Sequence, residues 1–326
     1  MTGSGAATLT GVHEPMTRRG WLLFAAMSVI WGVPYLLIKV AVKHVEPPVV
    51  VFGRTSIAAA VLLVLAVRTG ALRSALRRWR PVLLFAAVEM GGPWLLLTNA
   101  ERRLPSGLTG LLVACVPLFG ALAAYTLGDH AALRPVRLMG IVIGLGGVAL
   151  LVGGDLGGGA HGIPWWSVAQ VMLVCVGYSI GPFIIDRRLA DVPSIGVVAV
   201  SLAAVAIVVA PLAWLARPAH VPPANAWAAI ITLAAVCTGL AFVVFFALIA
   251  EIGPTRATLI TFVNPAVAVG LGALVLDERI TLATIGGFVL VMTGCWFATR
   301  GHAPVVVANL DGVSSLNDVR NASSAS

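Results

Sequence analysis

The chain has 326 residues, of which 59% are hydrophobic and only 10% are charged, and its mean hydropathy is +1.00. A soluble domain carries about a quarter charged residues, so this composition excludes a cytosolic enzyme, a disordered chain and a disulfide-rich secreted module. In a soluble protein the formal net charge of +8 would indicate a nucleic-acid partner, but here the positions of the basic residues decide its meaning.

Ten apolar runs have about the length that a membrane-spanning helix needs. Such a helix takes about 20 mostly apolar residues, because each residue adds about 1.5 Å across a hydrocarbon core about 30 Å thick. The runs are, in chain order, Trp21–Val42, Val49–Val67, Pro81–Ala100, Gly107–Leu127, Leu138–Gly153, Trp165–Ile185, Ser194–Leu215, Trp227–Ala250, Arg256–Leu276 and Thr281–Ala298. The polar tails at 1–17 and 300–326 cannot bury a core and are predicted to be disordered. Arg18 and Arg19 resemble the start of a signal peptide, but the run after them is too long for one, so we interpret it as an uncleaved first helix.

The basic residues are concentrated in alternate loops. With the N-terminus inside, 14 Lys and Arg residues lie on the inner side and 5 on the outer side. Because positive loops resist translocation, both termini are predicted to be cytoplasmic. The net charge is therefore a topology signal. We expect a multi-pass protein of the cell (inner or plasma) membrane, surrounded by the lipid bilayer, with no nucleic-acid partner.

The sequence repeats itself at an offset of 148 residues. This offset aligns Pro34 with Pro182, Pro117 with Pro265, and Ala86-Ala87-Val88 with Ala234-Ala235-Val236, and an offset of 147 aligns Gly140 with Gly287 and Gly147 with Gly294. Each half, 18–153 and 165–299, then holds five helices, and because five is odd the second half enters the membrane in the opposite orientation. We therefore predict an all-α, polytopic integral membrane protein with ten transmembrane helices arranged as a 5+5 inverted repeat. Secondary transporters have this architecture, and their halves rock around a site at the membrane midplane.

Several short motifs resemble the EamA-type family of the drug/metabolite transporter superfamily. They are Trp31-Gly32-Val33-Pro34-Tyr35 followed by Lys39, Arg54 in the second run, the prolines in the fourth and ninth runs, and Leu276-Asp277-Glu278-Arg279-Ile280-Thr281 before a Gly-rich last run. The likeness extends from Trp21 to about Ala298, with two departures: Gly128-Asp129-His130 stands where the family usually has a glutamate, and the sixth run lacks a Trp-Gly pair. The resemblance implies two repeats that move small metabolites, with helices 1–4 and 6–9 around the cavity. It implies no particular substrate.

We expect a secondary transporter that moves a small metabolite, an amino acid or a drug-like amphipathic compound, by alternating access, with export as the expected direction. The sequence leaves open whether protons are coupled and whether the chain is a monomer or a homodimer. A flippase for lipids or lipid-linked sugars is the alternative within this architecture, and an integral membrane enzyme is the alternative from another class. Such an enzyme would need clustered carboxylates or histidines for a metal ion, whereas the six histidines are dispersed in loops and tails. We therefore expect no enzyme, no cofactor and no metal site. The four cysteines, Cys115, Cys175, Cys237 and Cys295, are predicted to be small core residues without a disulfide.

Glu89 lies near the middle of the third run, where a charged residue costs about 2.5–3.5 kcal/mol on insertion scales and usually faces a cavity or a partner. The hypothesis is that Glu89 is a coupling site or binds a substrate amine, and the alternative is a structural ion pair with Arg54 or Lys39. Arg54 has the guanidinium fork that binds a carboxylate bidentately, or it pins its helix to neighbouring carbonyls. Lys39 is near enough to the outer surface to extend its amine into water.

Five uncharged residues at a similar depth are suited to line a pocket with aromatic surface and a few hydrogen-bonding groups: Trp31, Tyr35, Tyr178, Thr238 and Asn264. The alternative for each is packing or hydrogen bonding between helices.

Pro117 and Pro265 each lack an N–H group and are predicted to break their helices, which would free the carbonyls of Val113 and Thr261. Breaks at corresponding positions of two halves indicate a transport site, and a simple kink is the alternative. Gly140-x-x-x-Gly144 permits close contact between helices of one chain, and Glu278-Arg279 is expected to form a turn and a local ion pair.

Overall fold

Helices form nearly all of the chain that the computed structural model describes, which is residues 16–126, 135–156 and 164–299. The first half contains α1 (Arg18–Gly32), α2 (Pro34–Ala41), α3 (Pro47–Arg68), α4 (Ala71–Arg77), α5 (Trp79–Phe85), η1 (Ala86–Gly91), α6 (Gly92–Ala100), α7 (Ser106–Val113), α8 (Val116–Thr126) and α9 (Pro135–Leu156). The second half contains α10 (Trp165–Arg188), α11 (Ser194–Leu215), α12 (Ala224–Ala234), η3 (Ala235–Leu240), α13 (Ala241–Ile252), α14 (Pro254–Ala257), α15 (Ile260–Leu276) and α16 (Leu282–Thr299). Residues 1–15 and 300–326, which make up nearly all of the tails whose disorder the sequence predicts, and Gly128-Asp129-His130 lie outside the described residues.

These elements combine into ten apolar segments, which we number span 1 to span 10. Spans 1 to 5 are α1–α2, α3, α5–η1–α6, α7–α8 and α9, and spans 6 to 10 are α10, α11, α12–η3–α13, α15 and α16. Within the described ranges, nine of the segments are long and apolar enough to cross a membrane, and span 9 is a shorter apolar helix. The predicted all-α membrane fold with ten helices is confirmed.

Local sequence explains where the spans begin. Thr17 caps α1, because its hydroxyl oxygen accepts the N–H of Gly20 at 2.9 Å. Proline opens or immediately precedes α3, α9, α10, α11 and α12, where its missing N–H costs nothing and its fixed φ suits the first turn. The loop between spans 2 and 3 contains the short helix α4, which the apolar runs did not predict.

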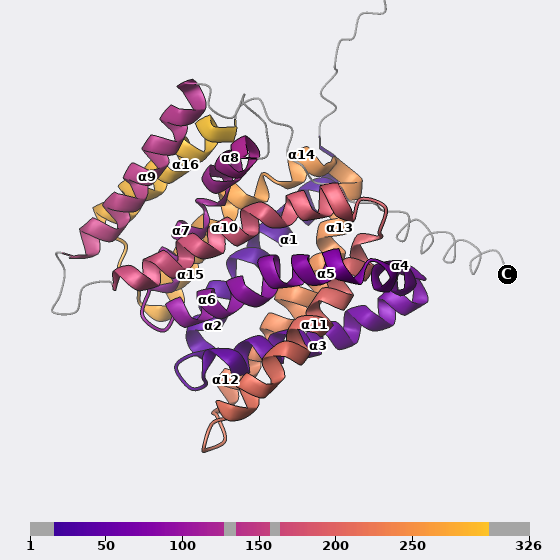
Figure 1. The fold of residues 1–326 in the computed structure, drawn as a ribbon. Helices are drawn as coiled ribbons and strands as arrows, with labels where there is room; N and C mark the ends of the chain where they lie inside the picture. The colour runs from indigo at the N-terminus through magenta and orange to yellow at the C-terminus, as the bar shows by residue number, and fades with distance from the viewer. Residues whose placement is uncertain (1–15, 127–134, 157–163, 300–326) are drawn as a thin grey trace, which may run out of the picture.

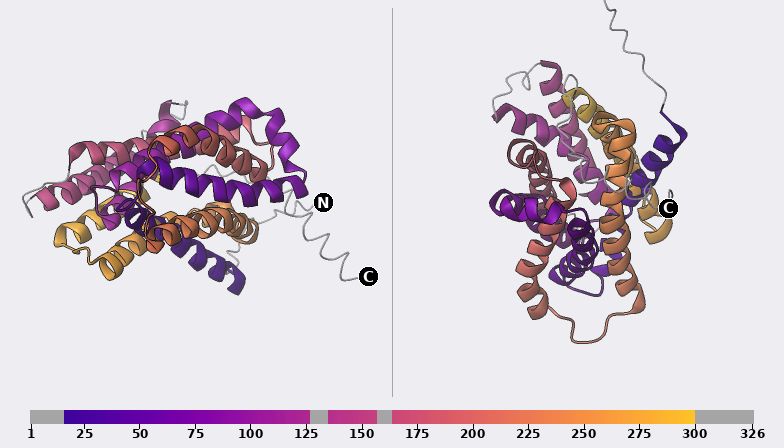
Figure 2. Two further views of the ribbon diagram at one scale, coloured as in Figure 1. Left: turned by 90° about the horizontal axis from the view of Figure 1, so that it is seen from below. Right: turned by 90° about the vertical axis from the view of Figure 1, so that its right-hand side faces the viewer.

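The two halves pack against each other in a symmetric pattern. Span 2 packs along span 7, span 4 along span 9 and span 5 along span 10. In addition, span 3 contacts span 6 in the same way that span 8 contacts span 1. Figure 1 shows α9 and α16 side by side at one flank of the molecule, and most helices run roughly along one direction in the left view of Figure 2. Exchanging the halves reproduces these pairings, as an inverted repeat requires.

Glycines produce the closest of these contacts. A Cβ added to Gly140 would lie 2.7 Å from the Gly294 carbonyl oxygen, and one added to Gly147 would lie 2.9 Å from that of Gly287. The repeat aligns Gly140 with Gly287 and Gly147 with Gly294, so the two contacts are symmetry copies of one another. The small-residue spacing of span 5 therefore serves packing within the chain.

Charged contacts between loops show which loops share a side. Thr17 and Arg19 contact Glu251, and Arg78 pairs with Asp191 at 2.7 Å. We call this side the Glu251 face. On the other side, the Glu278 face, Glu46 pairs with Arg102 at 2.6 Å and Glu278 contacts the start of α7. Each contact joins loops or helix ends that ten alternating crossings place on one side.

The outer surface of the bundle carries many large apolar side chains, among them Leu22, Val61, Val142, Ile207 and Leu274, which are each more than half exposed. Soluble monomers rarely expose so much apolar surface. A lipid-facing surface explains it.

Candidate functional site

Spans 3 and 8, which occupy the same place in the two halves, each contain one wide turn of π-helix. The turns are η1 and η3, and each has six residues. Glu89 is the fourth residue of η1 and Thr238 is the fourth residue of η3. Turns of this kind in α-helices occur frequently at functional sites. Two predicted site residues therefore occupy the same position in the two wide turns, which the sequence pattern did not reveal.

Arg54 links the two halves. Its side chain is 9% exposed, and its Nε donates to the Thr238 hydroxyl at 2.8 Å. The Thr238 hydroxyl in turn donates to the carbonyl of Leu233 at 2.9 Å. The guanidinium carbon lies 3.6 Å from the centre of the Trp94 ring, a stacked arrangement that Arg favours. Arg54 is thus anchored by a hydroxyl and an indole ring, and not by the carbonyls that we expected as the alternative.

Tyr35 and Tyr178 complete the surroundings of Arg54. Both lie within electrostatic range of its guanidinium. Tyr35 packs against Gly110 of span 4, and Tyr178 packs against the two largest clusters of buried apolar side chains. Since Tyr178 also lies within electrostatic range of Glu89, six side chains from spans 1, 2, 3, 6 and 8 form one group. We call it the central polar cluster: Tyr35, Arg54, Glu89, Trp94, Tyr178 and Thr238.

Glu89 has no ion-pair partner in the described part of the chain. Its Oε2 is buried without a hydrogen bond, and a Cβ on Gly181 would overlap this oxygen. Gly181 therefore makes the space that the carboxyl group occupies between span 3 and span 6. The alternative of a structural pair with Arg54 or Lys39 is wrong for this conformation, because Arg54 donates to Thr238 and Lys39 donates to backbone carbonyls.

Trp31 and Asn264 make contacts between helices that do not include Arg54. The Trp31 ring lies 4.7 Å from the ring of Phe245, centre to centre, and so joins α1 to α13. With its amide nitrogen facing the backbone, Asn264 donates to the carbonyls of Ser28 and Ile260 at 3.0 Å and joins α15 to α1. These contacts correspond to the packing alternative that the sequence left open.

The two prolines behave differently. Span 4 is interrupted at Ala114 and Cys115, just before Pro117, which lies in the first turn of α8. Pro265 lies inside α15, which continues through it, so a break at Pro265 is wrong. The helical chain is instead interrupted before α15, at Thr258 and Leu259, which separate α14 from α15. Membrane helices tolerate an internal proline when local adjustments satisfy the freed backbone groups.

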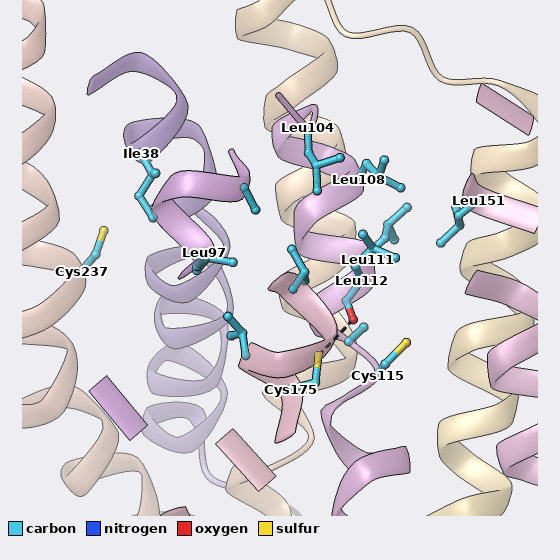
Figure 3. Close-up of a cluster of buried hydrophobic side chains, with 14 of the residues drawn as sticks. Ile38, Leu97, Leu104, Leu108, Leu111, Leu112, Cys115, Leu151, Cys175 and Cys237 are labelled. Carbon is cyan, nitrogen blue, oxygen red and sulfur yellow. Dashed lines mark hydrogen bonds between the residues drawn. The ribbon is translucent and has the colours of Figure 1, made fainter. Parts of the chain in front are cut away.

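Cysteine thiols satisfy carbonyls at the break in span 4. Cys175 Sγ donates to the Leu112 carbonyl at 3.4 Å, which Figure 3 shows as a dashed line, and Cys295 Sγ donates to the Ala114 carbonyl at 3.1 Å. All four cysteines are buried and free of disulfides, as the sequence predicted. Their hydrogen-bonding role at the break was not predicted.

Three polar residues on the Glu278 face differ from expectation. Lys39 does not extend into water, because its Nζ donates to the carbonyls of Glu101 at 2.7 Å and Leu104 at 2.8 Å. Glu278 does not form a local pair with Arg279, because its two oxygens accept the N–H groups of Ser106 and Gly107 at 2.6 and 2.8 Å. Glu278 thereby satisfies two free donors at the N-terminus of α7. Glu101, which the sequence analysis did not single out, is fully buried.

Comparison with known proteins gives one family. The sequence pattern of the EamA-like transporter family matches residues 18–153 and again 165–300.

Two relatives carry transporter names. The uncharacterized inner membrane transporter YedA of Escherichia coli (strain K12) is 29% identical over 254 residues, which are 76% of this chain and 79% of that protein. The uncharacterized transporter YvbV of Bacillus subtilis (strain 168) is 25% identical over 302 residues, 90% of this chain and 96% of that protein. A crystal structure with 23% identity superposes with a TM-score of 0.60 over 86% of this chain and 96% of its own, and this likeness shows the fold.

Proposed function

Since the chain belongs to the EamA-like transporter family, we propose that it is a secondary transporter that moves a small amphipathic metabolite across the cell membrane by alternating access. The substrate would bind at the central polar cluster. The observation that carries this proposal is the Arg54–Thr238 hydrogen bond of 2.8 Å, which joins the first half to the second inside a buried aromatic surround. A site made by both halves changes its access when the halves rock against each other.

The chemistry of the cluster supports a substrate class. Arg54 offers a guanidinium group for a carboxylate, and Trp94, Tyr35 and Tyr178 offer aromatic surface. The carboxyl group of Glu89 is available for an amine or a proton, because its Oε2 has no partner in the described chain. A solute with one acidic group, one amine and an apolar body, such as an amino acid, matches these groups. Glu89 would bind the amine of the substrate or the coupling proton.

The orientation of the chain is also a proposal. The contacts Arg78–Asp191 and Arg19–Glu251 support a common side for the loops of the Glu251 face, and this face carries most of the basic residues. Because positive loops stay in the cytoplasm, we assign the Glu251 face and both termini to the cytoplasmic side.

Ligand-dependent thermal unfolding of the purified full chain tests the proposal. The panel would contain amino acids, nucleobases, polyamines and cationic dyes, each at two pH values, with the wild type, Glu89→Gln and Glu251→Gln. A ligand that binds only the folded state stabilises it by about 2.7 kcal/mol at a hundredfold excess over Kd. We expect a compound that raises the melting temperature of the wild type and Glu251→Gln but not that of Glu89→Gln.

Glu251 is the matched control because it is the acidic residue of span 8 and contacts Thr17 and Arg19 at the end of the bundle. An equal response of all three proteins would remove Glu89 from the site. No response from any solute, together with stabilisation by lipids or lipid-linked sugars, would overturn the metabolite proposal in favour of a flippase.

A further inference from the structure

Glu101 is a fully buried carboxyl group at the Glu278 face, directly after the last residue of span 3. It is 0% exposed, and neither carboxyl oxygen has a hydrogen-bond partner in the residues that the structure describes. An ionised carboxylate offers about four lone-pair sites for donors. Burying the charge with none of them filled is far less favourable than burying the neutral acid. The environment therefore favours the protonated form.

Lys39 holds this segment without pairing with the carboxylate. Its Nζ donates to the backbone carbonyls of Glu101 and Leu104 at 2.7 and 2.8 Å. Glu101 takes part in none of the ion pairs Arg19–Glu251, Arg78–Asp191 and Arg102–Glu46.

The charged and titratable groups facing Glu101 come from three elements: Lys39 and Tyr35 from α2, Arg54 from α3, and Glu278 from the segment between α15 and α16. Burial raises the pKa of the Glu101 carboxyl well above its usual range, although Lys39 and Arg54 act in the opposite direction. Glu278 adds to the increase.

A cavity lies on the same face as this group and shares two residues with its surroundings. A cavity of about 200 Å³ opens at the Glu278 face and is lined by Lys39, Lys43, Arg103, Pro105, Leu276 and Glu278. Two of these residues, Lys39 and Glu278, also face Glu101. Lys39 thus lines the cavity and also donates to the backbone carbonyl of Glu101.

We propose that Glu101 is a proton-binding site, which carries a proton in this conformation and exchanges it with water at the Glu278 face through the cavity. Binding converts the carboxylate to the carboxylic acid, and release returns the proton to water. The use of this proton in transport rests on the proposed function. Lys39, which holds the Glu101 backbone, is a positioning residue for the exchange.

Infrared spectroscopy of the full chain in lipid vesicles tests the protonation state directly. The C=O stretch of a carboxylic acid is separate from the bands of carboxylates, so a protonated side chain at about pH 7 is visible when ordinary carboxyl groups with a pKa of about 4 are ionised. The measurement compares the wild type with Glu101→Gln, Glu89→Gln and Asp277→Asn. Asp277 is the matched control, because it is exposed on the same face and its φ of 56° suits asparagine.

We expect the carboxylic acid band of Glu101 at pH 7 in the wild type, in Asp277→Asn and in Glu89→Gln, and its loss in Glu101→Gln. Absence of the band in Glu89→Gln, or its persistence unchanged in Glu101→Gln, would overturn the proposal. The first of these outcomes does not depend on folding of the Glu101 variant. Neither depends on a transported solute, so failure here is distinct from failure of the proposed function.

Thermal unfolding at different pH values supplies a second test, because the proposal predicts the direction in which stability changes with pH. Because the folded-state pKa of Glu101 is raised, the folded protein binds this proton more tightly than the unfolded chain does. Stability is then lost as the pH rises above about 4.3, the ordinary pKa of glutamate, towards the folded-state pKa. We expect the melting temperature of the wild type to fall further over this pH range than that of Glu101→Gln. A parallel decline in the two proteins would contradict the assignment.

Discussion

The hydroxyl group of Thr238 joins two elements of the second half to one of the first. Thr238 lies in the wide turn η3, and its hydroxyl group accepts from Arg54 Nε of α3 at 2.8 Å and donates to the Leu233 carbonyl of α12 at 2.9 Å. A hydrogen bond to a charged group contributes about 1.5–3 kcal/mol, and removing one partner leaves the other buried without compensation. This hydroxyl group is therefore expected to matter for the stability of the contact between the halves.

Replacing Thr238 by Val keeps the shape of the side chain but removes both hydrogen bonds. We expect Thr238→Val to destabilise the protein by about 2 kcal/mol, seen as a lower melting temperature in detergent. Thr55→Val is the control, because the Thr55 hydroxyl only donates to carbonyls of its own helix, α3. Equal losses in the two variants would show that the contact with Arg54 contributes nothing.

A double-mutant cycle isolates the pair. In combination with Arg54→Lys, which removes the guanidinium fork, Thr238→Val is expected to cost less than it does alone, with a coupling energy of about 0.5–3 kcal/mol. Strict additivity of the two changes in unfolding free energy would contradict the pairing.

Residue type and position in the sequence identified some of the side chains at the two proposed sites as candidates and missed others. Arg54 and Glu89 were predictable as candidates because charge inside an apolar run is costly. Trp94 and Glu101 were not, for different reasons. Trp94 is one apolar residue in an apolar run, and only the fold places it under Arg54. Glu101 stands beside two arginines at the end of a span, and this sequence pattern is typical of a solvated loop.

At the scale of elements, glycine spacing determines how closely spans 5 and 10 approach. Gly147 faces the backbone of α16, since an added Cβ would lie 2.8 Å from the Val291 nitrogen and 2.9 Å from the Gly287 oxygen. Gly146, its neighbour in α9, faces open space. The repeat alignment predicted that Gly147 corresponds to Gly294, but it could not predict that Gly147 lies against Gly287.

The two neighbouring glycines give opposite predictions. Gly146→Ala is expected to stabilise α9 by up to about 1 kcal/mol, because Ala is the better helix former. Gly147→Ala is expected to lower the melting temperature, because backbone atoms of α16 must move to admit the methyl group. A stabilising effect of both substitutions would contradict the close approach of the two helices.

Breaks in helices were the element feature hardest to predict. Span 4 is interrupted two residues before Pro117, whereas Pro265 lies inside a continuous helix and the wide turns η1 and η3 contain no proline. A break depends on whether its free carbonyls find donors. In span 4 the thiols of Cys175 and Cys295 supply them from spans 6 and 10, and no local sequence pattern encodes such distant partners.

Two conservative substitutions test the contribution of the Cys295 hydrogen bond to stability. Cys295→Ser keeps a donor for the Ala114 carbonyl, whereas Cys295→Ala removes it. We expect Cys295→Ala to be the less stable by about 1 kcal/mol, measured as the difference in melting temperature. A more stable alanine variant would show that the thiol serves packing only.

At the scale of the whole molecule, the symmetric pairing of spans matches the offset read from the sequence. Spans 2 and 7, 4 and 9, and 5 and 10 are counterparts in the repeat, and each pair is in contact. The number of spans and the repeat were predictable because both depend on hydropathy and spacing over long distances. The identity of the contacting helices depends on the packing of the complete chain.

The sidedness of the molecule is accessible to labelling. A membrane-impermeant maleimide applied to intact cells is expected to label Lys43→Cys, on the Glu278 face, and to leave Arg188→Cys, on the other face, unlabelled until the cells are opened. The native cysteines are buried and give a low background. The reverse pattern would invert the proposed topology.

In the proposed function, a solute crosses the membrane through a site around Arg54. The most direct measurement is counterflow of the stabilising solute into vesicles that contain the wild type, Arg54→Gln or Arg217→Gln. Arg217 is the matched control, because it also lies over a tryptophan ring, that of Trp214, but on the exposed surface. We predict counterflow in the wild type and Arg217→Gln and a loss of at least about tenfold in Arg54→Gln, equivalent to about 1.4 kcal/mol of lost interaction. Counterflow at the wild-type rate in a folded Arg54→Gln protein would exclude Arg54 from the transport site.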